Sequence, residues 1–433
     1  MSFVWVVHGL SLSSLLGAIV VFTSSGCGDG FEGIKDEGAS DGSAPISATD
    51  ADSDADVAPS PFSLSANVSS LYVGQGEQNV ALTIAITRAE GFTTPVTISV
   101  NGLPSAVHVG ALTLAGGDTS GTLLFGADPS AILGGATISV LGVAGEHSAG
   151  TSLTLFVAGR MDFDADGTFV VPQVVPPTLD FYLWGGGGGG AGIYGSGSGK
   201  GHGGAGGAAL GHVAVTPAEV LTIQVGGGGQ AQNDRSGAGG GYTALRRGAT
   251  LLLLAGGGGG GGYGYRPGGV GGGETGGNGG TNDSGRGGTA TAGGLGSGTH
   301  TGRDGAAWRG GIGLGGTNAD SLPGASPGGG ASGSGGGGGG GFFGGGGGGG
   351  ACGGGGGSGF AHDSVLAIDA VGGGELKNPR LLVGDGQTPP LTSSAYYTAG
   401  VGIGGTQGSA EGSATTPGGN GRAVIVLAKP TQP

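Results

Sequence analysis

Apolar and polar residues alternate in short runs between Phe62 and Val157, and turn-forming residues separate the runs. A period of two residues is typical of strands with one buried face. The expected strands are 62–66, 79–88, 95–101, 111–114, 122–125, 136–143 and 152–157. Seven short strands in about 100 residues predict an immunoglobulin-like β-sandwich, which we place at residues 59–160.

Aliphatic and β-branched runs continue beyond residue 161, but glycine separates them. Such runs do not occur in flexible linkers and favour strands. The expected strands are 168–171, 179–184, 212–215, 220–225, 242–245, 250–254, 365–370 and 423–427. We therefore predict an all-β chain in which residues 161–433 form a second β-sandwich with a polyglycine insertion at 256–359.

Glycine supplies 119 of the 433 residues and occurs in uninterrupted runs such as 335–341, 344–350 and 353–357. A polyglycine run offers no side chains for a core or for chemistry, so its order must come from backbone hydrogen bonds between segments. Polyproline-II-type helices suit this role, because all their N–H and C=O groups point outward. The composition therefore predicts a scaffold or binding module and no enzyme.

Two resemblances refine this prediction. The segment 91–100 followed by Gly102-Leu103-Pro104 resembles bacterial Ig-like domains, which implies a spacing or adhesive role. The segments 168–172, 251–262 and 335–360 resemble the glycine-rich domain of the anaplastic lymphoma kinase receptor family. That resemblance implies a TNF-like, jelly-roll sandwich carrying polyglycine helices; in that family the domain contributes to cytokine binding. Phage tail-tip adhesins and glycine-rich antifreeze proteins also contain such helices.

The N-terminal region reads as a targeting segment. An apolar stretch, 10–22, precedes Ser24-Ser25-Gly26-Cys27, which resembles the lipobox of bacterial lipoproteins. The resemblance implies a signal peptide at 1–26, lipidation of Cys27, and anchoring by acyl chains. Gly28 in place of Asp suggests the outer membrane, with the protein exposed at the cell surface. No Lys or Arg precedes the apolar stretch, so an uncleaved anchor or a non-lipidated secreted protein is the alternative.

The charge is unevenly distributed. The formal net charge is −14, and residues 28–58 contain nine acidic residues but only one lysine, Lys35. A segment of this composition predicts an extended tether, which we place at 27–58. Binding to nucleic acid requires a basic surface, and the chain has none.

Alternating carboxylates provide the one candidate metal site. Asp162, Asp164 and Asp166 precede Gly167, and such a pattern can converge on Ca²⁺. Gln173 occupies the position where a calcium loop has a bidentate Glu, which favours a solvated linker over a calcium-stiffened domain junction. No other cofactor is expected. His362, Asp363 and Ser364 are adjacent in sequence, and this arrangement does not by itself form a catalytic triad.

Large aromatic residues interrupt the glycine runs and are the candidate ligand contacts. They are Tyr263, Tyr265, Trp308, Phe342 and Phe343. At helix tips they would contact a ligand, whereas packing against neighbouring strands is the structural alternative. The sequence thus predicts a surface lipoprotein for adhesion or ligand recognition. The second hypothesis is a structural envelope or coat component that associates with its own copies.

Overall fold

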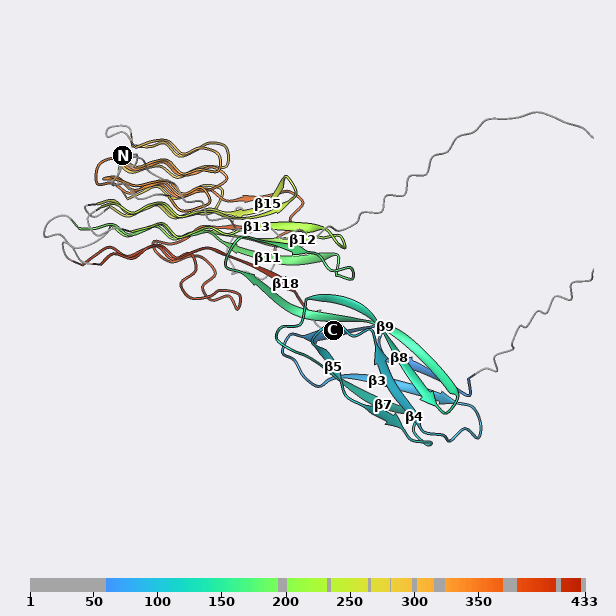
Figure 1. The fold of residues 1–433 in the computed structure, drawn as a ribbon. Helices are drawn as coiled ribbons and strands as arrows, with labels where there is room; N and C mark the ends of the chain where they lie inside the picture. Colours follow the sequence, from blue (N-terminus) through green and yellow to red (C-terminus); the bar gives the residue numbers. More distant parts are fainter. Residues whose placement is uncertain are drawn as a thin grey trace, which may run out of the picture. The chain divides into compact units, whose positions relative to one another are not determined.

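The computed structural model describes residues 60–193, 201–231, 235–263, 266–280, 282–297, 302–314, 324–368, 380–409 and 414–429. Residues from Pro59 to Pro433 belong to one compact unit. Within the described ranges the regular secondary structure is β only, as predicted, and the strands form three sheets (Figure 1). The predicted signal peptide, Cys27, the tether and Tyr265 lie outside the described residues.

Two sheets enclose the first hydrophobic core. The four-stranded sheet has the order β1-β3-β7-β5, with β1 Phe62–Ala66, β3 Val80–Arg88, β7 Ser120–Ala127 and β5 Val107–Val109. The second sheet contains β2 Ser70–Gly74, β4 Val96–Asn101, β6 Leu112–Leu114, β8 Gly134–Ala144 and β9 His147–Phe163. Alternate residues such as Leu82 and Ile84 in β3 and Ile138 and Val140 in β8 are buried in one shared core. This arrangement is consistent with a β-sandwich.

A second core lies between two further sets of strands. The set β17-β12-β11-β18 continues the sheet that contains β9, with β17 Leu381–Leu382, β12 Ala208–Ala214, β11 Thr178–Trp184 and β18 Arg422–Leu427. The separate five-stranded sheet has the order β10-β13-β14-β15-β16, with β10 Gly167–Val170, β13 Val220–Gln224, β14 Thr243–Arg247, β15 Thr250–Ala255 and β16 Phe360–Ala361. Phe181, Ile223, Leu253 and Ile425 meet in this core.

Strand β9 crosses the predicted boundary at 160/161. Its first part pairs with β8 up to Val157, and its last part, Gly159 to Phe163, pairs with β18. The prediction ended this strand at Val157. The stretch that was read as a linker is therefore strand over Met161, Asp162 and Phe163, and this strand joins the two cores without a flexible connection.

The glycine runs lie side by side as extended traces that continue from the strands (Figure 1). The run 185–192 follows β11, and its N–H groups donate in turn to three other segments, 201–207, 235–241 and 416–419. The donors are Gly185, Gly188 and Ala191 to the first segment, Gly186, Gly189 and Gly192 to the second, and Gly187 and Gly190 to the third. The hydrogen-bond pattern thus repeats every three residues, and we call the set of runs bonded in this way the glycine bundle.

The glycine bundle draws on more of the chain than the predicted insertion at 256–359. Runs after β11, β13 and β15 lead into it, and runs before β12, β14, β16 and β18 lead out. Its donor–acceptor distances are near 2.9 Å in the run 185–192, for example between Gly187 N and Gly419 O. Every residue from 185 to 193 is buried. A Cβ added at Gly188 would lie against the carbonyl oxygen of Gly259, well inside van der Waals contact. Glycine is required here because neighbouring backbones touch.

Four short strands were not predicted, namely β2, β5, β16 and β17. Of these, β16 and β17 have two residues each, which is too few to establish a period. The expected strand at 365–370 is absent from its described part, where Leu366 forms an isolated bridge with His212. Residues 369 and 370 lie outside the described residues.

Candidate functional site

Five aromatic side chains gather on the outer face of the five-stranded sheet. We define this aromatic cluster as Tyr242, Trp308, Phe342, Phe343 and Phe360. The ring centroids of Trp308 and Phe342 are 5.5 Å apart in an edge-to-face arrangement, and those of Phe342 and Phe360 are 4.5 Å apart. Three of the five predicted contact residues therefore lie together, although they are distant in sequence from Tyr242.

A β-bulge positions the sheet beneath this cluster. The pairing of β14 and β15 shifts between Leu245 and Arg246, which leaves Leu252 without a direct partner. As a result Leu251 and Leu254 pack with the aromatic cluster, while Leu252 and Leu253 face the opposite core. Bulges commonly re-aim a side chain next to a site, and here the shift falls at Arg246.

Trp308 is held in a backbone conformation that L-residues rarely adopt. Its φ is 68°, and its N–H donates to the carbonyl oxygen of Phe342 at 3.2 Å. A bulky residue in the left-handed region is an outlier, and such strain concentrates at functional sites. The indole ring packs against the face of the sheet that carries Tyr242 and Arg246.

Arg246 lies against the Trp308 ring. The guanidinium carbon is 4.8 Å from the ring centroid, and Nε donates to Gln224 Oε1 at 3.4 Å. Among the described residues, no carboxylate forms an ion pair with Arg246. The adjacent Arg247 differs, because it pairs with Glu219 at 2.8 Å. The guanidinium of Arg246 is thus oriented by the Trp308 ring, the Gln224 amide and a hydrogen bond with the Tyr242 phenol, and within the described ranges no ion pair neutralises its charge.

These groups line an open pocket of about 460 Å³ that we call the Arg246 pocket. Its lining residues are Thr222, Gln224, Tyr242, Arg246, Gly248 and Trp308. Burial raises the pKa of Tyr242, while the nearby Arg246 cation acts in the opposite direction. Tyr242 therefore stays neutral at physiological pH and offers a phenol that can donate or accept a hydrogen bond.

The remaining aromatic candidates do not join this pocket. Tyr263 is half-buried, and its N–H donates to Ser236 Oγ at 2.8 Å, at another position in the glycine bundle. Tyr265 lies outside the described residues. Sequence reasoning did not select Tyr242, Arg246 or Gln224. The usable signal was Tyr242-Thr243-Ala244-Leu245-Arg246, where Tyr and Arg have the same parity and therefore face the same side of a strand.

Two aspartates of the predicted calcium site share Arg422, and the third has a backbone partner. Arg422 lies 2.8 Å from Asp162 and 3.4 Å from Asp164, while Asp166 accepts a hydrogen bond from the Val225 N–H at 2.7 Å. No group of three metal-ligating side chains occurs among the residues that the structure describes. The ion pair between Asp162 of β9 and Arg422 of β18 links these two neighbouring strands, and the calcium site remains a prediction.

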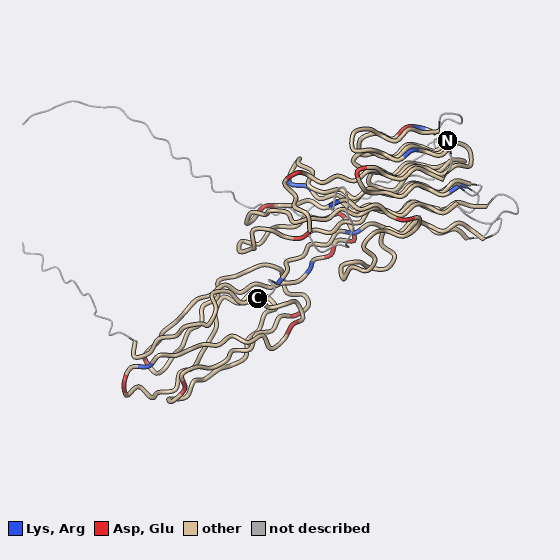
Figure 2. The backbone as a smooth tube through the Cα atoms, turned by 180° about the vertical axis from the view of Figure 1, so that it is seen from behind, with Lys and Arg blue, Asp and Glu red and all other residues tan. Residues whose placement is uncertain are grey.

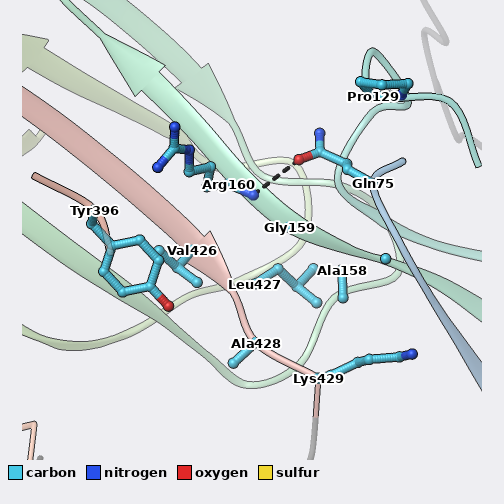
Figure 3. A pocket seen from close by; sticks show the side chains of 11 residues that line it. Gln75, Pro129, Ala158, Gly159, Arg160, Tyr396, Val426, Leu427, Ala428 and Lys429 are labelled. Carbon is cyan, nitrogen blue, oxygen red and sulfur yellow. Dashed lines mark hydrogen bonds between the residues drawn. The ribbon is translucent and has the colours of Figure 1, made fainter. Parts of the chain in front are cut away.

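A larger groove of about 630 Å³ lies beside the end of β18 (Figure 3). Its polar groups already have partners in the protein. Gln75 accepts a hydrogen bond from the Arg160 N–H at 3.0 Å and donates to Ala131 at 2.7 Å. Lys429 lies 2.7 Å from Glu77, and this hydrogen bond is the main cause that lowers the pKa of Glu77. The groove therefore reads as a seam between β2, β9 and β18 and offers fewer unused groups than the Arg246 pocket.

One contact involves residues of the kind used in hydrolases. His362 Nδ1 lies 2.9 Å from Ser364 Oγ, and the Ser364 N–H also points to Nδ1, at 3.1 Å. Both residues belong to one turn, and a nitrogen that accepts a backbone N–H is poorly placed to act as a base toward the hydroxyl. This contact is characteristic of a turn.

Fold and site together define an all-β protein with an aromatic and arginine pocket beside a hydrogen-bonded glycine bundle. Comparison with protein-family models and with curated proteins finds no match for the chain. In the described part of the chain, no helix has the length and apolar character needed to cross a bilayer.

Proposed function

We propose that the protein is a non-catalytic, surface-exposed binding module whose ligand occupies the Arg246 pocket. The glycine bundle is, on this proposal, a set of polyglycine-II-type helices, and the two cores belong to an Ig-like and a TNF-like sandwich. The threefold repeat of hydrogen bonds supports the helical assignment, since polyproline-II geometry has three residues per turn.

The observation that carries the proposal is the uncompensated guanidinium of Arg246 held against Trp308 at 4.8 Å in an open pocket. Ligand sites combine apolar walls with a few oriented polar groups, and their volumes range from about 300 to 1,000 Å³. Aromatic rings and arginine are also the residues that dominate binding energy at interfaces. The glycine bundle gives this pocket a rigid support.

The location is proposed from the sequence alone. The lipobox-like segment ending at Cys27 and the acidic stretch 28–58 support a lipid-anchored protein held away from the outer membrane by a tether. A binding module at the cell surface would be presented to ligands outside the cell by this arrangement.

The test is retention of the purified full-length chain on a panel of immobilised polysaccharides, proteins and lipid vesicles. Trp308→Ala should reduce retention at least about tenfold, because the ring that holds Arg246 is lost. Phe92→Ala is the matched control, since Phe92 is also half-buried and contacts an arginine, Arg88, but is remote from the pocket. Retention on none of the surfaces, or equal retention of the two variants, would contradict the proposal.

Self-association is the second candidate function, and one observation favours it. Val170 and Val220 are cross-strand partners, and they are 60% and 51% exposed at the β10 edge of the five-stranded sheet. An exposed apolar pair at a sheet edge can pair with another copy. Sedimentation of the full-length chain should then show concentration-dependent dimers that Val170→Lys removes; a monomer at all concentrations would eliminate this candidate.

A further inference from the structure

We infer that the Arg246 pocket recognises a carboxylate-bearing sugar residue, the kind that occurs in acidic polysaccharides. This inference rests on the proposed function and names the class of its ligand. It follows from three properties of the pocket: an oriented cation, an aromatic wall and neutral polar groups around them.

The oriented cation favours a planar anion. Arginine presents five N–H donors in a fixed fork that matches a carboxylate with two parallel hydrogen bonds. Gln224 takes the Nε–H of Arg246, and the Trp308 ring restrains the guanidinium plane. A side-chain hydrogen bond also links Arg246 to the Tyr242 phenol, and no carboxylate among the described residues pairs with the guanidinium, so its charge is available to an anion in the pocket.

The aromatic wall favours a ring with C–H groups on its face. The faces of Trp308 and Tyr242 carry negative charge from their π electrons, and their centroids are 6.1 Å apart. A pyranose ring presents axial C–H groups that are complementary to such a face. A flexible acidic peptide side chain offers no comparable surface.

The neutral polar groups favour hydroxyl groups. Thr222 and Gln224 alternate on β13 with the core residues Leu221 and Ile223, so both point to the pocket side. Together with the Tyr242 phenol they offer groups that both donate and accept, as a vicinal diol requires. The groups of the pocket thus match one carboxylate, one ring face and several hydroxyls.

Because the chain as a whole is acidic, direct contacts with Arg246 must bind the carboxylate. The chain has a net charge of −14, and charged residues occupy only short stretches of the backbone (Figure 2). The charge of Asp166 contributes to the raised pKa of Tyr242, and the Asp166 carboxylate accepts the Val225 N–H. A general field would repel polyanions, so binding must depend on the Arg246 fork and not on bulk electrostatics.

Calorimetry with the full-length chain tests the inference with three probes. They are alginate oligosaccharides, which carry a carboxylate on each sugar ring, neutral dextran oligosaccharides and polyglutamate. Only the alginate oligosaccharides should bind. Arg246→Lys keeps the charge but removes the fork and should weaken binding about tenfold or more. Gln224→Ala should weaken it several-fold, and Arg303→Gln, which removes an exposed charge elsewhere on the glycine bundle, should leave it unchanged.

The outcomes separate this inference from the proposed function. Equal binding of dextran or polyglutamate, or unchanged affinity after both Arg246→Lys and Gln224→Ala, overturns the acidic-sugar assignment. If Trp308-dependent retention is found on a protein or vesicle surface while alginate fails to bind, only the ligand class is wrong. If no surface retains the chain, the proposed function itself fails. Unchanged circular dichroism of each variant excludes unfolding as the cause of a loss.

Discussion

At the residue scale, Tyr182 shows how burial sets the ionisation of a phenol. Its ring packs 4.6 Å from that of Tyr396 and 6.4 Å from that of Trp184, in a cluster on the face of β11 opposite the second core. Burial, followed by the charges of Asp180 and Tyr396, raises the pKa of Tyr182 to about 12 from its ordinary 10.0. The folded protein therefore holds this phenol neutral in a range where the unfolded chain ionises it.

The first prediction follows from the sign of this shift. Because the folded pKa is raised, the stabilisation is complete below pH 10.0 and is lost as the pH rises toward about 12. Tyr182→Phe has no proton to lose, so its free energy of unfolding should fall less steeply over this range than that of the native chain. Denaturant unfolding at several alkaline pH values measures both slopes, and parallel slopes would contradict the prediction.

Individual site residues were predictable where they stood out from their surroundings. Trp308, Phe342 and Phe343 are bulky residues among glycines, and a side chain that cannot fit inside the bundle must lie at its surface. Arg246 does not stand out in the sequence in this way, because an arginine on a strand is an ordinary solvated residue. Its role depends on Trp308, which lies 62 positions later in the sequence (308 − 246), and no local pattern contains that proximity.

At the element scale, the four consecutive leucines of β15 show which structural feature a hydrophobic pattern does not predict, namely the face of the sheet on which each side chain lies. A run without alternation predicts a buried strand but does not assign its faces. The bulge at Leu252 resolves the ambiguity by turning Leu251 and Leu254 to the aromatic cluster. The register of β15 with β14 thus depends on the packing of both faces of the sheet. The sequence of four leucines does not encode that packing.

The second prediction concerns the glycine bundle. Gly188→Ala places a Cβ against the backbone of Gly259, where no side chain can move aside. Overpacking of a buried site typically costs about 1 to 3 kcal/mol, and the upper end is expected where backbones collide. The free energy of unfolding, from denaturant titration at neutral pH, measures the loss.

Gly117→Ala is the matched control for this substitution. Gly117 is exposed, its φ is not positive, and a Cβ there meets nothing within 4 Å. Alanine at a compatible position reduces the freedom of the unfolded chain, so stability should stay equal or rise by up to about 1 kcal/mol. Equal stability of the two variants would show that the bundle tolerates side chains. Close backbone packing would then not explain why the bundle consists of glycine.

At the scale of the whole molecule, the sheets and the glycine bundle form one continuous structure. The outgoing run 256–261 begins where β15 ends at Ala255, and the returning run 353–359 leads into β16. The all-β class and the interleaving of strand with glycine were predictable from the sequence. The assignment of neighbours in the bundle was not, because identical glycine runs carry no information on which run bonds to which.

The third prediction tests this continuity by amide hydrogen exchange of the purified chain. In the runs 335–340 and 354–357 the N–H groups donate within the bundle, for example Gly339 to Gly355 and Gly357 to Gly257. Exchange should be as slow as in β15, since a buried hydrogen-bonded amide exchanges only when its cooperative unit opens. Gly188→Ala should speed exchange in both runs, whereas Gly117→Ala should not. Exchange at the random-coil rate in the native chain would mean that the runs are flexible loops, and the Arg246 pocket would then lose the rigid support on which its proposed function depends.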